Sequence, residues 1–547
     1  MHDAAEVAVQ PPTTNPLNPT PRRDRTAWLW LAVGTLLLQF AWFAHVLPIA
    51  GWLAPVFLLR FVRGQRVTVG LLTIGLIGYL TVLVAMRGSI TAPDIYLFAL
   101  AGLTMIVSYG ADRMFARRLG GLLGTLVFPA TDTGLAFLAS TASSGAFATL
   151  GAPAYTQASE LTLVQLVSVT GLWGLSFLIT WLAPVANDLW EHGFDPRQVR
   201  RGTTAFVAVL AATFLFGGAQ LAFFAPDSPT VRVAALAPDR ELASAADTAE
   251  LGPRPLPSAT RTAVRGAYLD PLADDLFART REAAGGGARI VVWSEAAAYV
   301  FKEDEAAFLG RARAVARDEG IYLQIGLVSM LPTDRYPSVE IRAILLDPAG
   351  KVLWDYPKAT KVLSDPNLPG PGIVHTVDTP YGTLATVICF DADWPSLVRQ
   401  AGMAGTDLLL VPSSDWQEVA ELHARMAVFR AVENGANLVR PTRRGTSVAS
   451  DYQGRLLGYK SDYFVGTDHT MVANVPTEGR PTLYVYIGEI VGWMSVLGMI
   501  VLPAVALARR RRHDDTRDSS SAPDAESGPA AARDTAWQAE RPDRGTP

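Results

Sequence analysis

The chain has 547 residues, too many for one ordinary domain, and half of them are hydrophobic while only 18% are charged. With a mean hydropathy of +0.21, this composition is typical of a protein that lies partly in a membrane. The formal net charge of −4 argues against a nucleic-acid partner, because a phosphate-binding surface normally needs a basic domain or stripe.

Both ends of the chain are predicted to be disordered cytoplasmic tails. Residues 1–26 are rich in Pro, Thr and Arg and lack the apolar core of an ordinary signal peptide. Residues 509–547 begin with four arginines, and the rest of this segment has almost no large apolar side chains that could form a core.

Apolar runs long enough to cross about 30 Å of hydrocarbon follow the first tail. They lie at residues 27–44, 46–62, 67–86, 93–110, 119–139, 161–188 and 204–225, with an eighth at about 487–508. The second and fifth runs contain prolines and polar residues, which a membrane helix tolerates where neighbours satisfy the freed backbone groups. The sequence therefore predicts a seven-helix membrane domain, residues 27–225, and a final membrane helix, residues 487–508.

Arginines are distributed unevenly over the loops between these runs. With the N-terminus inside, the cytoplasmic loops carry Arg63 and Arg66, then Arg113, Arg117 and Arg118, then Arg197, Arg200 and Arg201. The opposite loops are poorer in positive charge, as the positive-inside rule expects. This bias predicts that both termini are cytoplasmic and that residues 226–486 lie outside the cytoplasm.

Residues 226–486 have the pattern of a globular α/β domain. Runs rich in β-branched residues predict strands, among them VRVAALA, ARIVVWSE, IYLQIGLVSM, IRAILLD, GTLATVICF, DLLLVPSS, ANLVRPT and TMVANV. Helical stretches alternate with them, namely PLADDLFARTREAA, EDEAAFLGRARAVARDEG and EVAELHARMAVFRAVENG. Residues 240–265 are predicted to form a loop.

Cys389 is the only cysteine of the chain, so neither an internal disulfide nor a multi-cysteine metal site is possible within one chain. It ends a predicted strand, and Glu295 and Lys358 also follow predicted strands. Sites in open α/β sheets usually lie at such strand ends. Together these residues could supply a thiol nucleophile, a base and a cation for a developing oxyanion.

Each of these residues also has a simpler interpretation. A single cysteine at the end of an apolar strand is often an inert small hydrophobe, and a Glu or Lys there is usually a solvated end group. Lys361 competes with Lys358 for the cationic role. His423, in a helical stretch, is interpreted as a structural or substrate-facing residue.

In this order and with these flanks, Glu295, Lys358 and Cys389 resemble the nitrilase, or carbon–nitrogen hydrolase, superfamily. The resemblance covers most of residues 231–476 and extends to SSDW at 413–416 and to the segment that begins at His423. It implies an α-β-β-α sandwich in which Glu295 is the general base, Lys358 stabilises the tetrahedral intermediate and Cys389 is the nucleophile. The YPK motif matches the family's position of the lysine, which favours Lys358.

The membrane part resembles one branch of that superfamily, the bacterial apolipoprotein N-acyltransferases. Seven spans, an extracytoplasmic domain and a closing span are its architecture, and residues 165–181 and 481–489 resemble its sixth span and its approach to the last helix. The resemblance implies a multi-pass enzyme of the bacterial cell membrane. It would move an acyl chain from a phospholipid, through a thioester on Cys389, to the N-terminal amine of a diacylglyceryl-cysteine lipoprotein. No metal and no cofactor are needed.

The resemblance also suggests substrate-binding residues. Phe390 and Asp391 stand where the family has Tyr-Glu after its cysteine, and Asp365 could replace a second glutamate whose position is taken by a proline. Trp394 and Trp416 could line an acyl groove, although aromatic residues near a site are as often packing residues. The family's usual Asn-Thr reads RRG at 443–445.

Two other functions remain open from the sequence. The first is a membrane-tethered amidase or hydrolase of the nitrilase type, in which water replaces the amine. The second is a catalytically inactive membrane scaffold. Analysis of the products would separate the first from an acyltransferase, and an unreactive Cys389 would favour the second.

Overall fold

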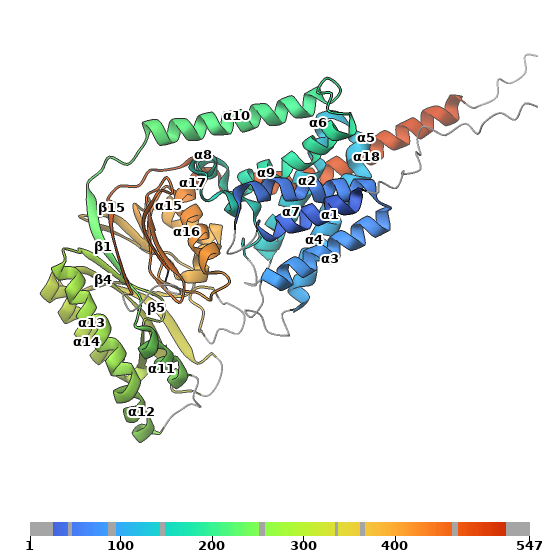
Figure 1. Ribbon diagram of the computed structural model, residues 1–547. Coiled ribbons are helices and arrows are strands. Elements are labelled where there is room, and N and C mark those ends of the chain that lie inside the picture. Colours follow the sequence, from blue (N-terminus) through green and yellow to red (C-terminus); the bar gives the residue numbers. More distant parts are fainter. Residues whose placement is uncertain are drawn as a thin grey trace, which may run out of the picture.

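The computed structural model describes residues 26–41, 46–85, 95–142, 148–250, 257–333, 337–360, 367–461 and 469–520. A helical part and a part built from β-sheets lie at opposite ends of the molecule (Figure 1). The predicted N-terminal tail lies outside the described residues apart from residue 26, as do Lys361 and Asp365. The prediction of a disordered tail from residue 509 is wrong at its start, because the last helix, Ile490–Ser520, continues through the four arginines, which are good helix formers. Residues 521–547 lie outside the described residues.

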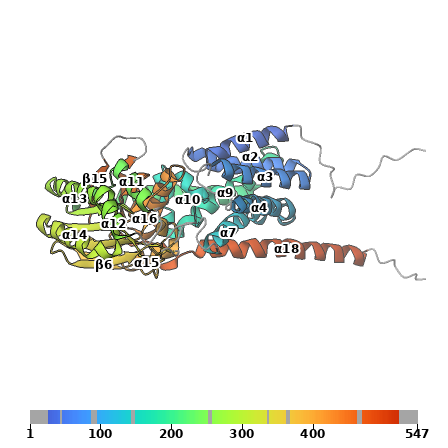
Figure 2. The same ribbon diagram turned by 90° about the horizontal axis from the view of Figure 1, so that it is seen from below.

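The helical part is built mainly from apolar helices. Its elements are α1 (Ala27–Gln39), α2 (Pro48–Gly64), α3 (Val67–Ala85), α4 (Ile95–Ala111), a π-helical turn (Asp112–Ala116), α5 (Arg117–Leu119), α6 (Gly121–Thr125), α7 (Val127–Ala142), α8 (Leu161–Val164), α9 (Val167–Glu191), α10 (Arg200–Phe223) and α18 (Ile490–Ser520). Helix α18 packs along α7 although the two are far apart in the sequence, and it extends beyond the other helices (Figures 1 and 2).

Helices occupy all eight predicted apolar runs, but fewer than eight are long enough to cross a membrane. Within the described ranges, five are long and apolar enough, namely Val67–Ala85, Gly121–Thr141, Val167–Glu191, Arg200–Phe223 and Ile490–Arg509. In the other three runs the helices have 13, 17 and 17 residues. The apolar helices are compatible with a membrane location, whereas the predicted count of eight spans is supported for five.

A buried cluster of charges joins three of these helices at one end. Arg63 on α2 donates two hydrogen bonds of 2.8 Å to the carboxylate of Asp112 and a third of 2.8 Å to Asp188 on α9. An arginine and an aspartate buried in this way must be paired, because an isolated charge would be expensive to remove from water. Their pairing fixes α2 and α9 against the turn that follows α4.

The other part contains two large sheets. The first has the order β15-β1-β2-β4-β5-β6, with β3 also paired to β4. Its strands are β1 (Thr230–Leu236), β2 (Ile290–Trp293), β3 (Ala298–Phe301), β4 (Tyr322–Met330), β5 (Val339–Leu346), β6 (Val352–Pro357) and β15 (Thr470–Pro476). The second has the order β14-β13-β11-β9-β8-β7, and β10 and β12 form a small parallel pair. These strands are β7 (Thr376–Thr379), β8 (Gly382–Thr386), β9 (Leu408–Leu410), β10 (Ser413–Ser414), β11 (Asn437–Arg440), β12 (Thr442–Arg443), β13 (Thr446–Ser450) and β14 (Leu456–Ser461).

Helices cover the outer faces of the two sheets. Helices α13 (Asp270–Gly285) and α14 (Glu305–Glu319) pack on the first sheet, and α16 (Ala420–Asn434), with α15 (Pro395–Met403) beside it, packs on the second. Central strands such as β2 and β9 are buried at every position, as expected for strands covered on both faces. The layers form the α-β-β-α arrangement that the resemblance implies, and all eight strand runs quoted above contain a strand.

The prediction of a loop at residues 240–265 is wrong for most of this segment. The chain forms α11 (Arg240–Glu250) and α12 (Ser258–Val264) there. The side chain of Asp239 accepts hydrogen bonds from the backbone N–H groups of Glu241 and Leu242, at 2.9 and 3.1 Å, and so caps the first helix. The Ala-rich sequence that follows favours a helix, a preference that the prolines after residue 252 concealed.

A buried joint connects the sandwich to the helical part. Helix α9 is interrupted at Gly171, whose φ is 63°. The backbone N–H of Leu172, which begins the next helical segment, donates a 2.7 Å hydrogen bond to the carboxylate of Glu433 on α16. Arg430 on the same helix pairs with Glu433 at 2.9 Å. A side chain of the sandwich therefore caps a helix of the apolar part and sets where the two parts meet.

Candidate active site

The three predicted catalytic residues lie at the ends of three strands. Glu295 follows β2, Lys358 follows β6 directly, and Cys389 lies just beyond β8. Their side chains are 4%, 3% and 6% exposed, respectively, so none is the solvated strand-end residue of the simpler interpretation. The fold thus gathers a carboxylate, an ammonium group and the only thiol in a protected place.

Glu295 and Lys358 form a direct pair. Lys358 Nζ donates a 2.8 Å hydrogen bond to Glu295 Oε1. Both groups are buried, so each needs the other to remain charged away from water. The backbone beside Glu295 is also fixed tightly, because a Cβ on Gly326 of β4 would lie 1.8 Å from the carbonyl oxygen of Ser294.

Cys389 is held in a strained turn. Its φ is 49°, a left-handed value that residues other than Gly rarely adopt. Cys389 also begins a short 3₁₀ helix, Cys389–Asp393. Its N–H donates to Pro412 O at 2.9 Å, and its Sγ donates to Ser414 O at 3.4 Å. The turn therefore directs the thiol toward the small β10–β12 pair.

The electrostatic surroundings keep the resting thiol protonated. Burial raises the pKa of Cys389 well above its usual value, and the carboxylate of Glu295 raises it further, whereas Lys358 lowers it. A thiol in this state reacts as a nucleophile only if a base removes its proton. Glu295 is the carboxylate with the strongest influence on this thiol.

Asp391 joins the lysine loop to the cysteine loop. Its fully buried carboxylate accepts hydrogen bonds from the Tyr356 hydroxyl, from the backbone N–H groups of Ala359, Thr360 and Ile388, and from the Thr360 hydroxyl, at 2.7 to 3.2 Å. Burial raises the pKa of Asp391, while its hydrogen bonds with Thr360 and Tyr356 lower it. With five donors from the protein itself, Asp391 positions the two loops, and its contact with substrate stays a prediction.

The aromatic residues predicted to contact substrate occupy different environments. Phe390 is only 1% exposed and packs in the core, and its contact with substrate stays a prediction. Trp394 and Trp416 are half-buried, and the indole N–H of each has no hydrogen-bond partner among the described residues. Trp416 lies edge-on to the ring of His423, with 5.6 Å between centroids. The two tryptophans are thus more exposed than Phe390, and their contact with substrate stays a prediction.

His423 lies in a network of charged residues that the sequence did not predict. Its Nδ1 is 2.9 Å from Asp415 Oδ1 and its Nε2 is 3.3 Å from Asp393 Oδ2. Arg440 donates to both oxygens of Asp415 at 2.9 Å. Burial alone would lower the pKa of His423, but the charges of Asp393 and Asp415 overcome this effect and raise it to about 9. The charged imidazolium braces the turn that carries Cys389, since Asp393 ends that turn.

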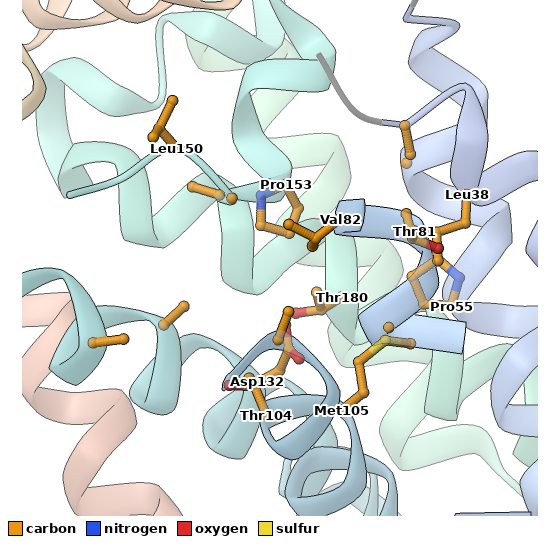
Figure 3. Close-up of a pocket in the computed structure, with 18 of the residues that line it drawn as sticks. Leu38, Pro55, Thr81, Val82, Thr104, Met105, Asp132, Leu150, Pro153 and Thr180 are labelled. Carbon is orange, nitrogen blue, oxygen red and sulfur yellow. The ribbon is translucent and has the colours of Figure 1, made fainter. Parts of the chain in front are cut away.

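A mainly apolar pocket of about 230 Å³ opens among α2, α3, α4, α7 and the segment that precedes α8 (Figure 3). Asp132 on α7 is the one acidic residue among its lining residues, and Thr104 and Thr180 also line it (Figure 3). Thr149, another lining residue, donates a 3.2 Å hydrogen bond to Asp393 O. The pocket thus reaches the segment that contacts the cysteine turn.

Across the described ranges, no group of three or more His, Cys, Asp or Glu side chains is placed to hold a metal ion.

The sequence pattern of the carbon–nitrogen hydrolases matches residues 263–488, which include all three strand-end residues. This segment is a carbon–nitrogen hydrolase domain, in agreement with its layered fold. A crystal structure of an amidase from Nesterenkonia sp. is 23% identical to the chain, covers 48% of this chain and 95% of the amidase, and has a TM-score of 0.35.

Apolipoprotein N-acyltransferases are similar over most of the chain. The one from Geobacter metallireducens is 26% identical, over 86% of this chain and 92% of its own length. Apolipoprotein N-acyltransferase 2 from Treponema pallidum is 27% identical, over 66% of this chain and 72% of its own length. These matches extend through the apolar helices as well as the hydrolase domain, so the chain is similar to apolipoprotein N-acyltransferases over most of its length.

Proposed function

We propose that this protein is an N-acyltransferase that moves an acyl chain from a phospholipid to the N-terminal amine of a lipoprotein. The observation that carries this proposal is the buried Glu295–Lys358 pair beside the only thiol of the chain. The relationship to apolipoprotein N-acyltransferases over most of the chain supports the choice of substrates.

The first half-reaction forms a thioester. Sγ of Cys389 attacks the carbonyl carbon of the phospholipid ester while its proton passes to Glu295. Negative charge develops on the former carbonyl oxygen, and the ammonium group of Lys358 stabilises it. When the intermediate collapses, the C–O bond breaks and the alkoxide of the lysophospholipid takes the proton from Glu295. The acyl group remains on Cys389.

The second half-reaction consumes the thioester. The α-amine of the lipoprotein's lipid-modified cysteine attacks the acyl carbon and Glu295 accepts a proton from it. The tetrahedral intermediate collapses with breakage of the C–S bond, and the sulfur regains a proton. The products are an amide on the lipoprotein and the free thiol of Cys389, so the cycle needs no cofactor.

The apolar helices explain how such substrates reach the thiol. Both substrates carry lipid chains, and the pocket in Figure 3 is lined mainly by apolar side chains and reaches the segment that contacts the cysteine turn through Thr149. Half-buried Trp394 and Trp416 offer further apolar surface near the site. Within this proposal they contact the acyl chain, and Asp365 lies outside the described residues.

The arginine distribution supports a topology for this enzyme. The arginine-rich loops and both termini face the cytoplasm, and the hydrolase domain lies on the extracytoplasmic side of the bacterial cell membrane. On that side the thiol meets phospholipids of the outer leaflet of this membrane and the lipid-modified ends of exported lipoproteins.

Product analysis tests the proposal. The purified protein in detergent is incubated with phospholipid and a diacylated lipopeptide that has a free N-terminal amine, and peptide and lipid products are measured by mass spectrometry. The expected product is the N-acylated peptide, absent for Cys389→Ala and Glu295→Gln and present for Asp378→Asn, a control at an exposed position. Release of free fatty acid without an acylated peptide would contradict the proposal and indicate that the protein is a hydrolase.

A further inference from the structure

Arg443 lies in the triplet that departs from the family's usual residues, and its side chain is buried beside the turn of Glu295. The side chain is only 2% exposed. Its Nη1 donates a 2.7 Å hydrogen bond to the carbonyl oxygen of Ala296, the residue after Glu295. The same Nη1 donates a 2.8 Å hydrogen bond to the hydroxyl of Tyr299 on β3.

The turn that Arg443 contacts is strained. Ala296 has a φ of 51°, which an alanine adopts only when its surroundings hold it there. The Ala296 carbonyl oxygen is the acceptor of the guanidinium, so the hydrogen bond acts on the strained residue itself. Without this donor, the turn would lose a contact that opposes its relaxation, and the side chain of Glu295 would move with the backbone.

An acidic side chain anchors the guanidinium from the other side. Nη2 of Arg443 is paired closely with the carboxylate of Asp247 on α11, which also accepts a 2.7 Å hydrogen bond from the hydroxyl of Tyr299. The Asp247 carboxylate, the Tyr299 hydroxyl and the Ala296 carbonyl thus fix the direction of the guanidinium. A planar group with several donors suits this arrangement better than an ammonium group, which has no fixed fork.

The main chain of Arg443 also supports the thiol side of the site. Strand β12 runs parallel to β10, with Arg443 opposite Ser414, and Arg443 O accepts a 3.0 Å hydrogen bond from the N–H of Asp415. The carbonyl of Ser414 is the group that Sγ of Cys389 contacts. Arg443 therefore contacts both the turn that carries Glu295 and the strand whose carbonyl group binds the thiol of Cys389.

We propose that Arg443 is a positioning residue that fixes Glu295 relative to Cys389, so that the carboxylate can accept the thiol proton. The biological meaning of this inference rests on the proposed function. The proton transfer from Cys389 to Glu295 can nevertheless be measured without a lipid substrate. This role gives a reason for an arginine at position 443, because its side chain donates a hydrogen bond to the Glu295 turn.

The reactivity of Cys389 toward iodoacetamide tests the proposal without any lipid substrate. In this reaction the C–S bond forms, the C–I bond breaks, iodide leaves and Glu295 accepts the thiol proton. Because the chain contains one cysteine, the mass gained by the intact protein reports on this thiol alone. Rates are measured from pH 6 to pH 10 for the full-length protein in detergent.

Four variants separate positioning from general disruption. Glu295→Gln removes the base and is expected to lower the rate at pH 7 by about 100-fold, within the usual range for general-base assistance. Arg443→Met is expected to lower it by at least about tenfold and to move the pH profile toward that of Glu295→Gln, since a displacement of about 1 Å can be that costly. Arg443→Lys should recover part of the loss, and Arg317→Met should behave as wild type because its side chain is 61% exposed on α14, in the outer layer of the sandwich.

A wild-type rate and pH profile for Arg443→Met would overturn the proposal. If Arg443→Met does not fold, Asp247→Asn provides the second test, because it loosens the anchor of the guanidinium and leaves Arg443 in place. It is expected to give an intermediate pH profile, and an unchanged profile would overturn the proposal. If the wild-type protein reacts as expected with iodoacetamide but transfers no acyl group, the proposed function fails while the positioning role stands.

Discussion

Asp391→Asn changes one carboxylate oxygen of Asp391 into an amide donor and leaves the side chain nearly the same size. Oδ1 accepts from the N–H and the hydroxyl of Thr360, whereas Oδ2 accepts from Tyr356, Ala359 and Ile388. The hydroxyls can rotate to become acceptors, but the backbone N–H groups cannot. The better orientation of the amide therefore places its nitrogen toward Thr360 and leaves one buried N–H without a partner.

The expected cost follows from that count. One buried donor without a partner costs about 1–3 kcal/mol, and the opposite orientation, with two such donors, costs about twice as much. The loss falls on the segment directly after Lys358, so we expect this loop to open more often. Acyl transfer should also slow, since Lys358 depends on the loop for its position.

Hydrogen exchange followed by mass spectrometry measures this effect locally. Peptides that contain the Thr360 amide are expected to exchange about five- to 150-fold faster in Asp391→Asn than in the wild type. This factor is the cost of about 1–3 kcal/mol converted into a ratio of exchange rates. Asp378→Asn makes the same chemical change at an exposed position with one hydroxyl donor, and it should leave exchange unchanged. Slower exchange in Asp391→Asn would refute the reasoning, because it would mean that desolvation of the carboxylate outweighs its hydrogen bonds.

Two further predictions concern the joint and the charged network. Gly171→Ala should destabilise the protein by more than 1 kcal/mol, because the new Cβ would lie 2.7 Å from the ring of Tyr484 at a φ of 63°. Gly193→Ala serves as the control, because its φ is 64° and no described atom lies within 4 Å of the added Cβ, so this variant should show only the backbone strain. Equal shifts of the unfolding midpoint in Gly171→Ala and Gly193→Ala would contradict the steric argument. His423 has its pKa raised to about 9, so its stabilising contribution is complete below about pH 6.5 and is lost as the pH rises through 9. The stability difference between wild type and His423→Gln should therefore shrink by on the order of 3 kcal/mol from pH 6 to pH 9.5, and a constant difference would show that His423 is not charged.

The local pattern of the sequence was sufficient for much of this architecture. Strand-end positions and the resemblance together predicted Glu295, Lys358 and Cys389, and the apolar runs predicted helices at their places. Strand β10 and strand β12 have only two residues each, too few for a periodic signal. Their pairing, which determines what the thiol contacts, depends on distant segments that only the fold brings together.

The interpretations of individual site residues were less secure for a related reason. Position next to the cysteine could not show that Asp391 is fully enclosed by donors or that Phe390 is a core residue. The network around His423 joins α16 to residues at 393, 415 and 440, which come from the cysteine turn, the segment before α16 and strand β11. Arg443 attracted attention only as a departure from the family's usual residues, because its contact with Ala296 spans 147 positions.

Intact-mass analysis of the protein shows whether Cys389 carries the acyl group between the two substrates. The detergent-solubilised protein is incubated with phospholipid, its mass is recorded, and a diacylated lipopeptide with a free amine is then added. The account predicts that the wild-type protein gains the mass of one acyl chain, that Cys389→Ala does not, and that the added mass moves to the peptide amine. An acylated peptide formed at the wild-type rate by Cys389→Ala would contradict the account, because transfer would then proceed without the thiol.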